Sequence, residues 1–474
     1  MTAVKKIVHR LFSCECMVKP SERRGWLPPT RDAYRIVLGL AWPAIVESVL
    51  IYLAASIDTM MVGGIGHEAI AAVGITTQPR FIILSMIFSL NVGVTAVVAR
   101  RRGSDDWLGA NRCLRQTLMI SITLSILLSA AGAVFAQPLM VLAGAEPQVM
   151  DMAVGYFQIT MIGNVFSSIS LTINAAQRGV GNTRVSMRTN LTANIINLIF
   201  NYLLINGVLF FPKWGVYGAA AATSLGNLIA MLMSFRSILR PDGFLTLRQK
   251  RGRVPWRFDK KTMKSVMNVM ASAMVEQVFM RVGFFINAIM VARLGTIAFA
   301  THQICMNINN IAFGFGDGFS IAASSLMGQG LGAKRPDQSK LYVSVCQRLG
   351  FLFSAGMLVL FLCTNQLVVR LFTNEADIIA VGGVIVIILA CVACPMTAQV
   401  IITGSLRGAG DTKYVAVMSL VCIGLERPFL TWLLCFPMGW GVVGAWMAML
   451  FDQVIRLVFC FVRFKSGKWS KIEL

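Results

Sequence analysis

Two carboxylates stand in an otherwise apolar stretch near the start of the sequence, where an ionisable group could bind a proton or a small cation. Glu47 and Asp58 are separated by eleven residues (58 − 47 = 11). At about 100° per residue, that spacing places both side chains on one face of a helix. If this helix crosses a membrane, there are two alternatives to ion binding. The carboxylates could reach towards the water at the membrane interface, or they could hydrogen-bond a neighbouring helix. We favour ion binding for Asp58 and leave both interpretations open for Glu47.

A row of asparagines offers a second kind of cation ligand. Asn190, Asn194, Asn197 and Asn201 follow one another at steps of four, three and four residues, so they line one face of a helix. Amide carbonyl oxygens can replace water around a hard cation, and the Thr223 hydroxyl could join them. The alternative is that these amides hydrogen-bond neighbouring helices, as is common in membrane bundles.

The composition shows what kind of element must position these groups. Apolar residues make up 56% of the chain and charged residues 14%, with a mean hydropathy of +0.69. A soluble domain carries about a quarter charged residues, so this is an integral membrane protein. The apolar runs are long enough for helices, which need about 20 residues to cross the hydrocarbon. We expect an all-α fold with twelve transmembrane helices.

Basic residues are concentrated in alternate loops. The loops at 99–103, 178–188, 248–261, 332–340 and 406–413 are basic, as is the C-terminal tail, whereas the loops between them are nearly uncharged. This is the positive-inside pattern, and it predicts a multi-pass protein of the plasma (inner) membrane with both termini in the cytoplasm. The net charge of +22 therefore predicts contact with membrane lipid headgroups and not with nucleic acid.

Other functional classes find little support in the sequence. The eleven cysteines lie mostly within apolar spans, where cysteine acts as a small apolar residue. His9, His67 and His302 are scattered, so we expect no histidine-rich metal centre. The basic N-terminal segment lacks the apolar core and cleavage site of a signal peptide.

The sequence contains an internal repeat with a constant offset. Glu47 corresponds to Glu276 (276 − 47 = 229), and QRGVGNTR at 177–184 corresponds to LRGAGDTK at 406–413. An offset held over that distance indicates duplication of an ancestral half, as in many transporters. Since each half holds six spans, the two halves are expected to enter the membrane from the same side, with a central cleft between them.

The repeat predicts the following organisation. A cytoplasmic N-terminal tail (1–32) precedes an N-lobe of six helices (33–240) and a cytoplasmic linker (241–262). A C-lobe of six helices (263–464) and a C-terminal tail (465–474) follow.

The second half does not repeat the chemistry of the first. Asp58 corresponds to Asn287 (287 − 58 = 229), and Asn197 corresponds to Glu426 (426 − 197 = 229). Glu276 repeats Glu47 in the seventh span, so it is expected to face the cleft as a second proton candidate. The remaining charged groups could form a structural ion network or a site, including the neighbours Glu426 and Arg427 and the pair Asp452 and Arg456.

Eight short motifs occur in a characteristic order along the chain. They are LAWP (40–43), IDTMMVGGIG (57–66), RGVGNTR (178–184), the helix with Asn197 and Asn201, GVYGAAAAT (215–223), ATHQICMN (300–307), SLMGQGLGA (325–333) and SLRGAGDT (405–412). Together they resemble the multidrug and toxic compound extrusion (MATE) family over about residues 35–460.

The resemblance implies two pseudo-symmetric six-helix lobes around a central cleft. It also implies an antiporter that exports organic, cationic or amphipathic, compounds in exchange for H⁺ or Na⁺. The family's cation site maps onto Asp58, Asn197, Asn201 and Thr223, and its seventh-helix carboxylate onto Glu276. Apart from the coupling ion, which could be Na⁺ at the Asp58 site, the resemblance implies no metal or other cofactor.

Two departures from the family pattern affect the expected ion site. Some members carry Asp at the position of Asn201, and sodium-type members carry Asp at the position of Met396. A C-lobe sodium site is therefore not expected, and coupling is expected to run through the first lobe. Glu47, Glu276 and Asn194 are further candidates for the substrate cleft or a second proton site.

Two alternatives to an antiporter follow from the same sequence. A lipid-linked oligosaccharide flippase would share the architecture, but the acidic and amide-rich first lobe argues against it. A membrane enzyme would need an Asp-rich metal motif or a partnered membrane histidine, and Asp105-Asp106 and His302 supply neither. We expect a monomeric transporter of small drug-like molecules and not an enzyme.

Overall fold

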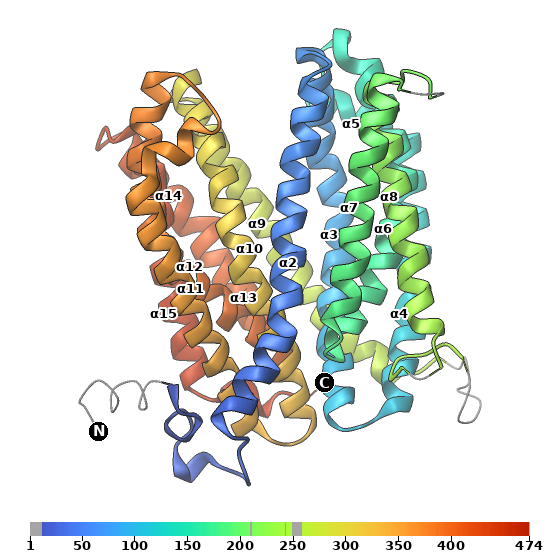
Figure 1. Cartoon of the computed structure of the whole chain (residues 1–474), viewed down its shortest axis with the longest axis vertical. Helices are drawn as coiled ribbons and strands as arrows, with labels where there is room; N and C mark the ends of the chain where they lie inside the picture. The colour runs from blue at the N-terminus through green and yellow to red at the C-terminus, as the bar shows by residue number, and fades with distance from the viewer. Residues whose placement is uncertain (1–11, 209–210, 242, 249–257, 474) are drawn as a thin grey trace. The chain divides into compact units, whose positions relative to one another are not determined.

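The computed structural model describes residues 12–208, 211–241, 243–248 and 258–473, and the secondary structure within these ranges is entirely helical (Figure 1). Ten of the described helices are long and apolar enough to cross a membrane. The helices α7 and α10 are not among them, although they have 24 and 37 residues. With both included, and with residues 412–435 counted as one segment, the described chain has the twelve long helical segments that the sequence predicted.

The chain divides into two compact units. The amino-terminal unit comprises Val46–Met270, and the carboxy-terminal unit comprises Met1–Ile45 and Ala271–Leu474. The division falls within two long helices, α2 (Thr30–Gly63) and α9 (Lys260–Ala292).

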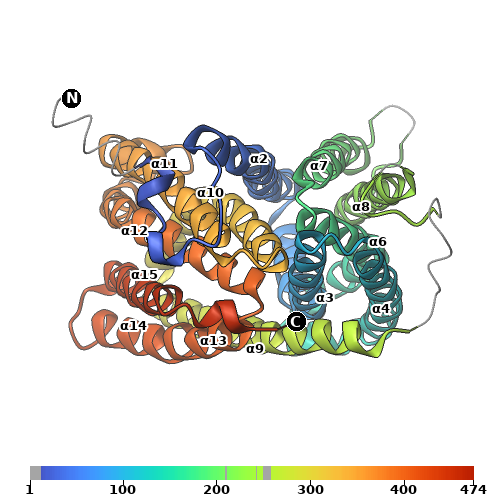
Figure 2. The same ribbon diagram turned by 90° about the horizontal axis from the view of Figure 1, so that it is seen from below.

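The amino-terminal unit is built around one central helix. In this unit α6 packs against α3, α4 and α8, and α7 packs against α8 (Figure 2). Phe157 of α6 is fully buried in this core. The helices of the unit, besides its parts of α2 and α9, are α3 (His67–Gly103), α4 (Trp107–Val134), α5 (Ala136–Leu142), α6 (Pro147–Gly179), α7 (Thr183–Asn206) and α8 (Val216–Leu239).

The carboxy-terminal unit repeats that arrangement. Here α12 is the central helix and packs against α10, α11 and α15, while α14 packs against α15 (Figure 2). Trp446 of α15 is the largest fully buried side chain among the residues that the structure describes. The elements of the unit, besides its parts of α2 and α9, are η1 (Cys14–Cys16), η2 (Pro20–Glu22), α10 (Thr296–Gly332), α11 (Pro336–Arg370), α12 (Ala376–Ala409), α13 (Thr412–Ser419), the π-helix η3 (Leu420–Glu426), α14 (Arg427–Cys435), α15 (Gly441–Lys465) and η4 (Lys468–Lys471).

The helix boundaries themselves carry the sequence repeat. The first residues of α3 and α10 differ by 229 (296 − 67), as do those of α4 and α11 (336 − 107) and those of α6 and α12 (376 − 147). Helices therefore begin at equivalent positions in both halves. The sequence repeat is a structural repeat at the level of single helices.

The segment before α2 is part of the core of the carboxy-terminal unit. Cys14 and Val18 are 2% and 1% exposed and pack with residues of α10, α11 and α12. Arg335 donates a hydrogen bond to the Trp26 carbonyl oxygen (2.9 Å), and Lys340 forms an ion pair with Glu22 (2.6 Å). The described part of the predicted N-terminal tail is thus held against the start of α11.

Candidate functional site

Asp58 lies in a polar group formed by three helices of the amino-terminal unit. Asn201 of α7 donates a hydrogen bond to Asp58 Oδ1 over 2.7 Å. The neighbouring groups orient the Asn197 amide with its nitrogen 2.8 Å from the same oxygen and its oxygen 3.1 Å from Thr223 Oγ1 of α8. The structure therefore brings Asp58, Asn197, Asn201 and Thr223 together in one hydrogen-bonded group.

The register of α2 against α7 explains why the group forms. Asn201 follows Asp58 by 143 residues, and Asn190 follows Glu47 by the same number. Equal separations are what two parallel helices in register produce, with one contact every three turns. The asparagine row thus faces the two carboxylates of α2.

The group has the chemistry of a site for a proton or a small monovalent cation. Asn197 and Asn201 are 7% and 1% exposed, so their amides are shielded from water. Both donate to Asp58, while Asn201 Oδ1 is buried and has no partner among the described residues. A carboxylate beside an unused amide oxygen offers two oxygen ligands, and the Asn197 amide and Thr223 hydroxyl provide more.

Two further residues near Asp58 were missed by the sequence interpretation. Arg80 of α3 lies close enough to interact electrostatically with both Asp58 and Tyr156 of α6. The Nε atom of Arg80 is buried without a partner among the described residues. Arg80 is an ionisable residue in the second apolar span, directly after Pro79, and this was the signal that could have identified it.

Glu47 is held by three donors at the other end of the asparagine row. Its Oε1 atom accepts hydrogen bonds from Arg178 (3.1 Å), Ser186 (2.6 Å) and Asn190 (2.6 Å). Glu47 is 2% exposed, and its Oε2 atom has no partner among the described residues. These contacts connect α2 to the end of α6 and the start of α7.

Glu276 forms the equivalent ion pair in the carboxy-terminal unit. Its two carboxylate oxygens accept hydrogen bonds from Nη2 and Nε of Arg407, and Glu276 is 2% exposed. Arg407 corresponds to Arg178 (407 − 178 = 229). The sequence interpretation expected Glu276 to face the cleft as a second proton candidate and named no partner for it, because nothing local in the sequence indicates one 131 residues away.

The repeated Arg-Gly motif gains a physical explanation from these pairs. Arginine binds the carboxylate, and the glycine after it lets two helices approach closely. A Cβ atom at Gly408 would lie 2.1 Å from the Ser324 carbonyl oxygen. The second glycine of each motif, Gly181 or Gly410, has a φ of +88° or +87° and ends the helix in the left-handed conformation.

Asn194 stands apart from the Asp58 group. Its Nδ2 atom is buried and has no partner among the described residues. Asn194 is therefore on the polar face of α7 without a hydrogen bond to either carboxylate of α2.

The counterpart of Asp58 in the carboxy-terminal unit is a neutral contact. Asn287 donates a hydrogen bond to Thr431 over 2.8 Å, across 144 residues and not 143. The π-helix η3 lies before Thr431, and a π turn contains one residue more than an α turn. The additional residue brings Thr431, in place of Leu430, to the position that matches Asn201.

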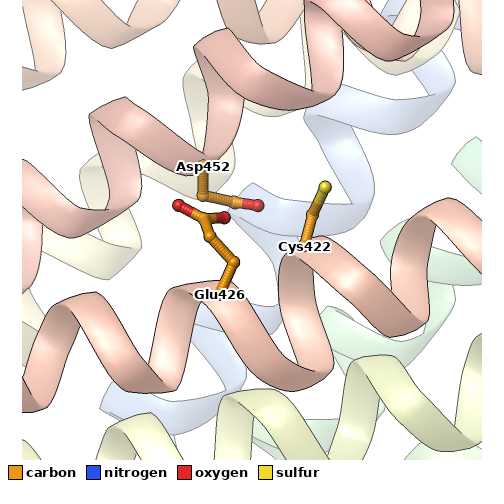
Figure 3. Close-up of side chains that lie close together, drawn as sticks. All are labelled: Cys422, Glu426 and Asp452. Carbon is orange, nitrogen blue, oxygen red and sulfur yellow. The ribbon is translucent and has the colours of Figure 1, made fainter.

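An acidic cluster includes two residues of the π-helix, Cys422 and Glu426, and Asp452 of α15. Ligand atoms of Cys422, Glu426 and Asp452 lie within 4.8 Å of one another, with the carboxyl groups of Glu426 and Asp452 side by side (Figure 3). Asp452 Oδ2 accepts from Arg456 over 2.7 Å and lies 4.0 Å from Arg427 Nη1. The two arginines balance the two carboxylates, which favours an ion network over a metal centre.

Met396 is 2% exposed and packs in an apolar cluster of the carboxy-terminal unit. The position at which an Asp was expected for a sodium-type member is therefore part of the hydrophobic core of this chain.

Comparisons with known proteins bear on the whole chain. A family model described as MatE matches residues 43–203 and again residues 272–433, and the two matches begin 229 residues apart (272 − 43). A probable multidrug resistance protein NorM of Thermotoga maritima is 25% identical over 92% of this chain and 93% of its own length. An FAD transporter of Shewanella oneidensis is 24% identical over 90% of this chain and 93% of its own length.

Solved structures agree on the fold. An outward-facing multidrug resistance MATE family transporter has a TM-score of 0.86 at 17% identity, over 93% of this chain and 97% of its own. A mutant of the Vibrio cholerae MATE transporter VcmN has a TM-score of 0.83 at 16% identity, over 93% and 99%. With the family model matching more than half of its length, in both halves of the repeat, this chain belongs to the MATE family of multidrug efflux transporters.

Proposed function

We propose that this protein is a cation-coupled antiporter that exports organic, cationic or amphipathic, compounds across the plasma membrane, with both termini in the cytoplasm. The observation that carries the proposal is the Asp58 group, in which one carboxylate accepts hydrogen bonds from two buried amides while Asn201 Oδ1 has no partner among the described residues. The basic loops support the orientation.

Protonation of Asp58 would change the contacts between α2 and α7. An ionised carboxylate only accepts hydrogen bonds, and here it accepts from Asn197 and Asn201. A protonated Asp58 has a hydroxyl that must donate, and Asn201 Oδ1 is the nearby acceptor that no described residue occupies. Rotation of the Asn201 amide would then exchange N–H···O for O–H···O and alter how α2 packs on α7.

Sodium would use the same atoms in a different way. The ion would be held by oxygens of Asp58, Asn201 and Thr223, with Asn197 turned so that its oxygen faces the ion. In the ion-bound group the amide oxygens of Asn197 and Asn201 would face the ion, whereas in the ion-free group their nitrogens face the Asp58 carboxylate. Either ion would displace the Asn201 N–H donor from Asp58, and antiport requires that the drug-bound state have a different affinity for the ion.

Transport by the purified protein in proteoliposomes would test the proposal. Ethidium movement is measured under an imposed pH gradient and, separately, under a Na⁺ gradient. We expect one gradient to drive ethidium against its own concentration gradient. Ethidium movement that ignores both gradients would contradict ion coupling.

One relative suggests that an anionic substrate should be included. The Shewanella protein named an FAD transporter is about as similar to this chain as the Thermotoga multidrug relative is. FAD is therefore a necessary second probe in the same vesicles. Gradient-driven FAD movement without ethidium movement would correct the substrate class and retain the antiport, whereas failure of both probes would favour the flippase alternative.

The contribution of the amides can be tested within α7. Asn201→Leu removes a donor to Asp58 and the unused acceptor, so gradient-driven transport should fall at least about tenfold, the change that about 1.4 kcal/mol produces. Asn206→Leu is the matched control, because Asn206 is exposed and donates to the Tyr202 carbonyl oxygen of its own helix. Equal transport by the two variants would remove Asn201 from the proposed site.

A further inference from the structure

We propose that a basic cavity in the amino-terminal unit, whose lining residues do not include the Asp58 group, binds a phosphate-bearing anion. The cavity has a volume of about 720 Å³. Four arginines line it: Arg102 at the end of α3, Arg188 in α7, and Arg236 and Arg240 at the end of α8. The described residues that line the cavity include no Asp or Glu.

Three of the four guanidinium groups of this cavity have no ion-pair or hydrogen-bond partner in the described part of the protein, and that of Arg102 has only an exposed, long ion-pair contact. Arg188, Arg236 and Arg240 are exposed and make no ion pair or hydrogen bond with another described residue. Arg102 lies over the Phe244 ring, 4.3 Å from its centroid, and its contact with the exposed Asp105 is 3.8 Å long. Like charges that face one cavity repel one another, so a bound anion would stabilise the arrangement.

Other arginines in the same unit show what a structural role looks like. Arg101 forms an ion pair with Asp106 over 2.8 Å, and Arg178 forms one with Glu47 over 3.1 Å. The guanidiniums of the cavity lack such close partners among the described residues. Their role is therefore not explained by the packing of the described chain.

The neutral side chains of the cavity already hold one another in place. Gln177 donates to Ser237 Oγ over 3.2 Å, and Asn182 donates to Gln177 Oε1 over 3.3 Å. These bonds connect the end of α6 both to the turn that precedes α7 and to helix α8. The walls are thus built independently of any ligand, and the guanidinium groups remain free to bind one.

The internal repeat shows that the six-helix fold does not itself require these four arginines. With the offset of 229, Arg102 and Arg188 correspond to Leu331 and Val417 (331 − 102 and 417 − 188). Between α8 and α15 the offset is 226, as for Gly218 and Gly444 (444 − 218), so Arg236 corresponds to Val462 (462 − 236). By the same offset Arg240 corresponds to Ser466 (466 − 240). None of the four counterparts is charged, so the cavity is specific to the first half.

The chemistry of the cavity selects phosphate. Arginine presents a planar fork of N–H donors that matches phosphate oxygens in pairs. Apolar members such as Val180, Met233 and Phe244 line the same cavity, which suits the headgroup and glycerol region of an acidic phospholipid. A soluble phosphorylated compound has the same binding chemistry, so the experiment must separate the two sources.

The test measures thermal unfolding of the intact chain in detergent micelles. Dioleoyl-phosphatidylglycerol, dioleoyl-phosphatidylcholine and inorganic pyrophosphate are added in separate arms. The phosphatidylglycerol arm should raise Tm above the phosphatidylcholine arm, because a ligand that binds only the folded state stabilises it. Arg188→Gln combined with Arg236→Gln should lose most of that rise.

A charge-matched control separates the cavity from general basicity. Arg184→Gln combined with Lys264→Gln removes two exposed positive charges of the same unit that do not line the cavity. This control should keep the rise. If the Gln variant does not fold, Arg188→Lys with Arg236→Lys is used, and it should keep only part of the rise because lysine lacks the fork.

The remaining outcomes identify the ligand or overturn the proposal. A rise with pyrophosphate that depends on the arginines would identify a soluble phosphorylated ligand, and a rise with phosphatidylglycerol alone would identify a lipid headgroup. The absence of any arginine-dependent rise, or an equal loss in the control, would overturn the proposal.

Discussion

Glu276 accepts hydrogen bonds from two nitrogens of Arg407, which lies 131 residues further along the chain. Arg178 bonds to Glu47 at the same separation in the other half of the repeat. Both halves thus retain a buried carboxylate paired with the arginine of the Arg-Gly motif. Asp58, in contrast, has the neutral Asn287 as its counterpart in the second half, so the proposed ion-binding chemistry is confined to the first.

The Glu276–Arg407 pair should contribute to stability. Breaking a buried ion pair costs about 3–5 kcal/mol, and we expect about 2–3 kcal/mol for Glu276→Gln because the Arg407 side chain is 29% exposed. Unfolding in mixed micelles titrated with SDS gives the free energy. In a double-mutant cycle with Arg407→Gln, the double variant should lose much less stability than the sum of the two single variants. If the losses of the single variants simply add, the ion pair does not contribute to stability.

The Asn287–Thr431 contact should depend on the Thr431 hydroxyl. Thr431→Val keeps the shape of the side chain but leaves the buried Asn287 amide without its acceptor, at a cost of about 1–3 kcal/mol. Thr431→Ser retains the hydroxyl and should lose less. Equal stability of the Val and Ser variants, measured by the same SDS titration, would show that this hydrogen bond is not formed.

The two carboxylates of the buried cluster should respond in opposite ways to loss of charge. Asp452→Asn removes the carboxylate that accepts from Arg456 and lies 4.0 Å from Arg427, and should destabilise the protein by about 3–5 kcal/mol. Glu426→Gln removes a carboxylate that lacks a hydrogen-bond partner among the described residues and lies beside another, so stability should stay the same or rise. A larger loss for Glu426→Gln than for Asp452→Asn would contradict the ion network.

The N-terminal segment makes a prediction about cysteine reactivity. Burial raises the pKa of the Cys14 thiol, whereas Cys16, two residues later, is exposed. Because the thiolate is the reactive form, a maleimide should modify Cys16 much faster than Cys14 near neutral pH. Peptide mapping by mass spectrometry measures both residues in one sample. Equal rates in the folded protein would show that this segment does not pack against α11.

Features that depend on regular spacing along the chain could be predicted from the sequence. The period of a helix placed Glu47 and Asp58 on one face of the first span. The steps between the four asparagines placed their side chains on one face of the fifth span. The repeat identified Glu276 as the counterpart of Glu47. Length and hydropathy predicted the twelve helices, because crossing a membrane imposes a minimum length on each.

Features that depend on contacts distant in sequence could not be predicted. The arginine partners of Glu47 and Glu276 lie 131 residues away, and only the packing of helices reveals them. The π turn before Thr431 changes the register by one residue, so the constant offset pointed to Leu430 instead. Arg80 was missed because its proximity to Asp58 follows from the packing of α3 and not from any motif.

The most direct test of the central claim is gradient-driven efflux by Asp58→Asn in proteoliposomes, beside Asp32→Asn. Asp32 lies in the same helix but is exposed in its first turn, so it is a matched control. We predict that Asp58→Asn abolishes ethidium movement on the coupling gradient while its Tm stays close to that of the unmodified protein, and that Asp32→Asn transports normally. Gradient-driven efflux by a folded Asp58→Asn variant at the rate of the control would show that the coupling ion binds elsewhere.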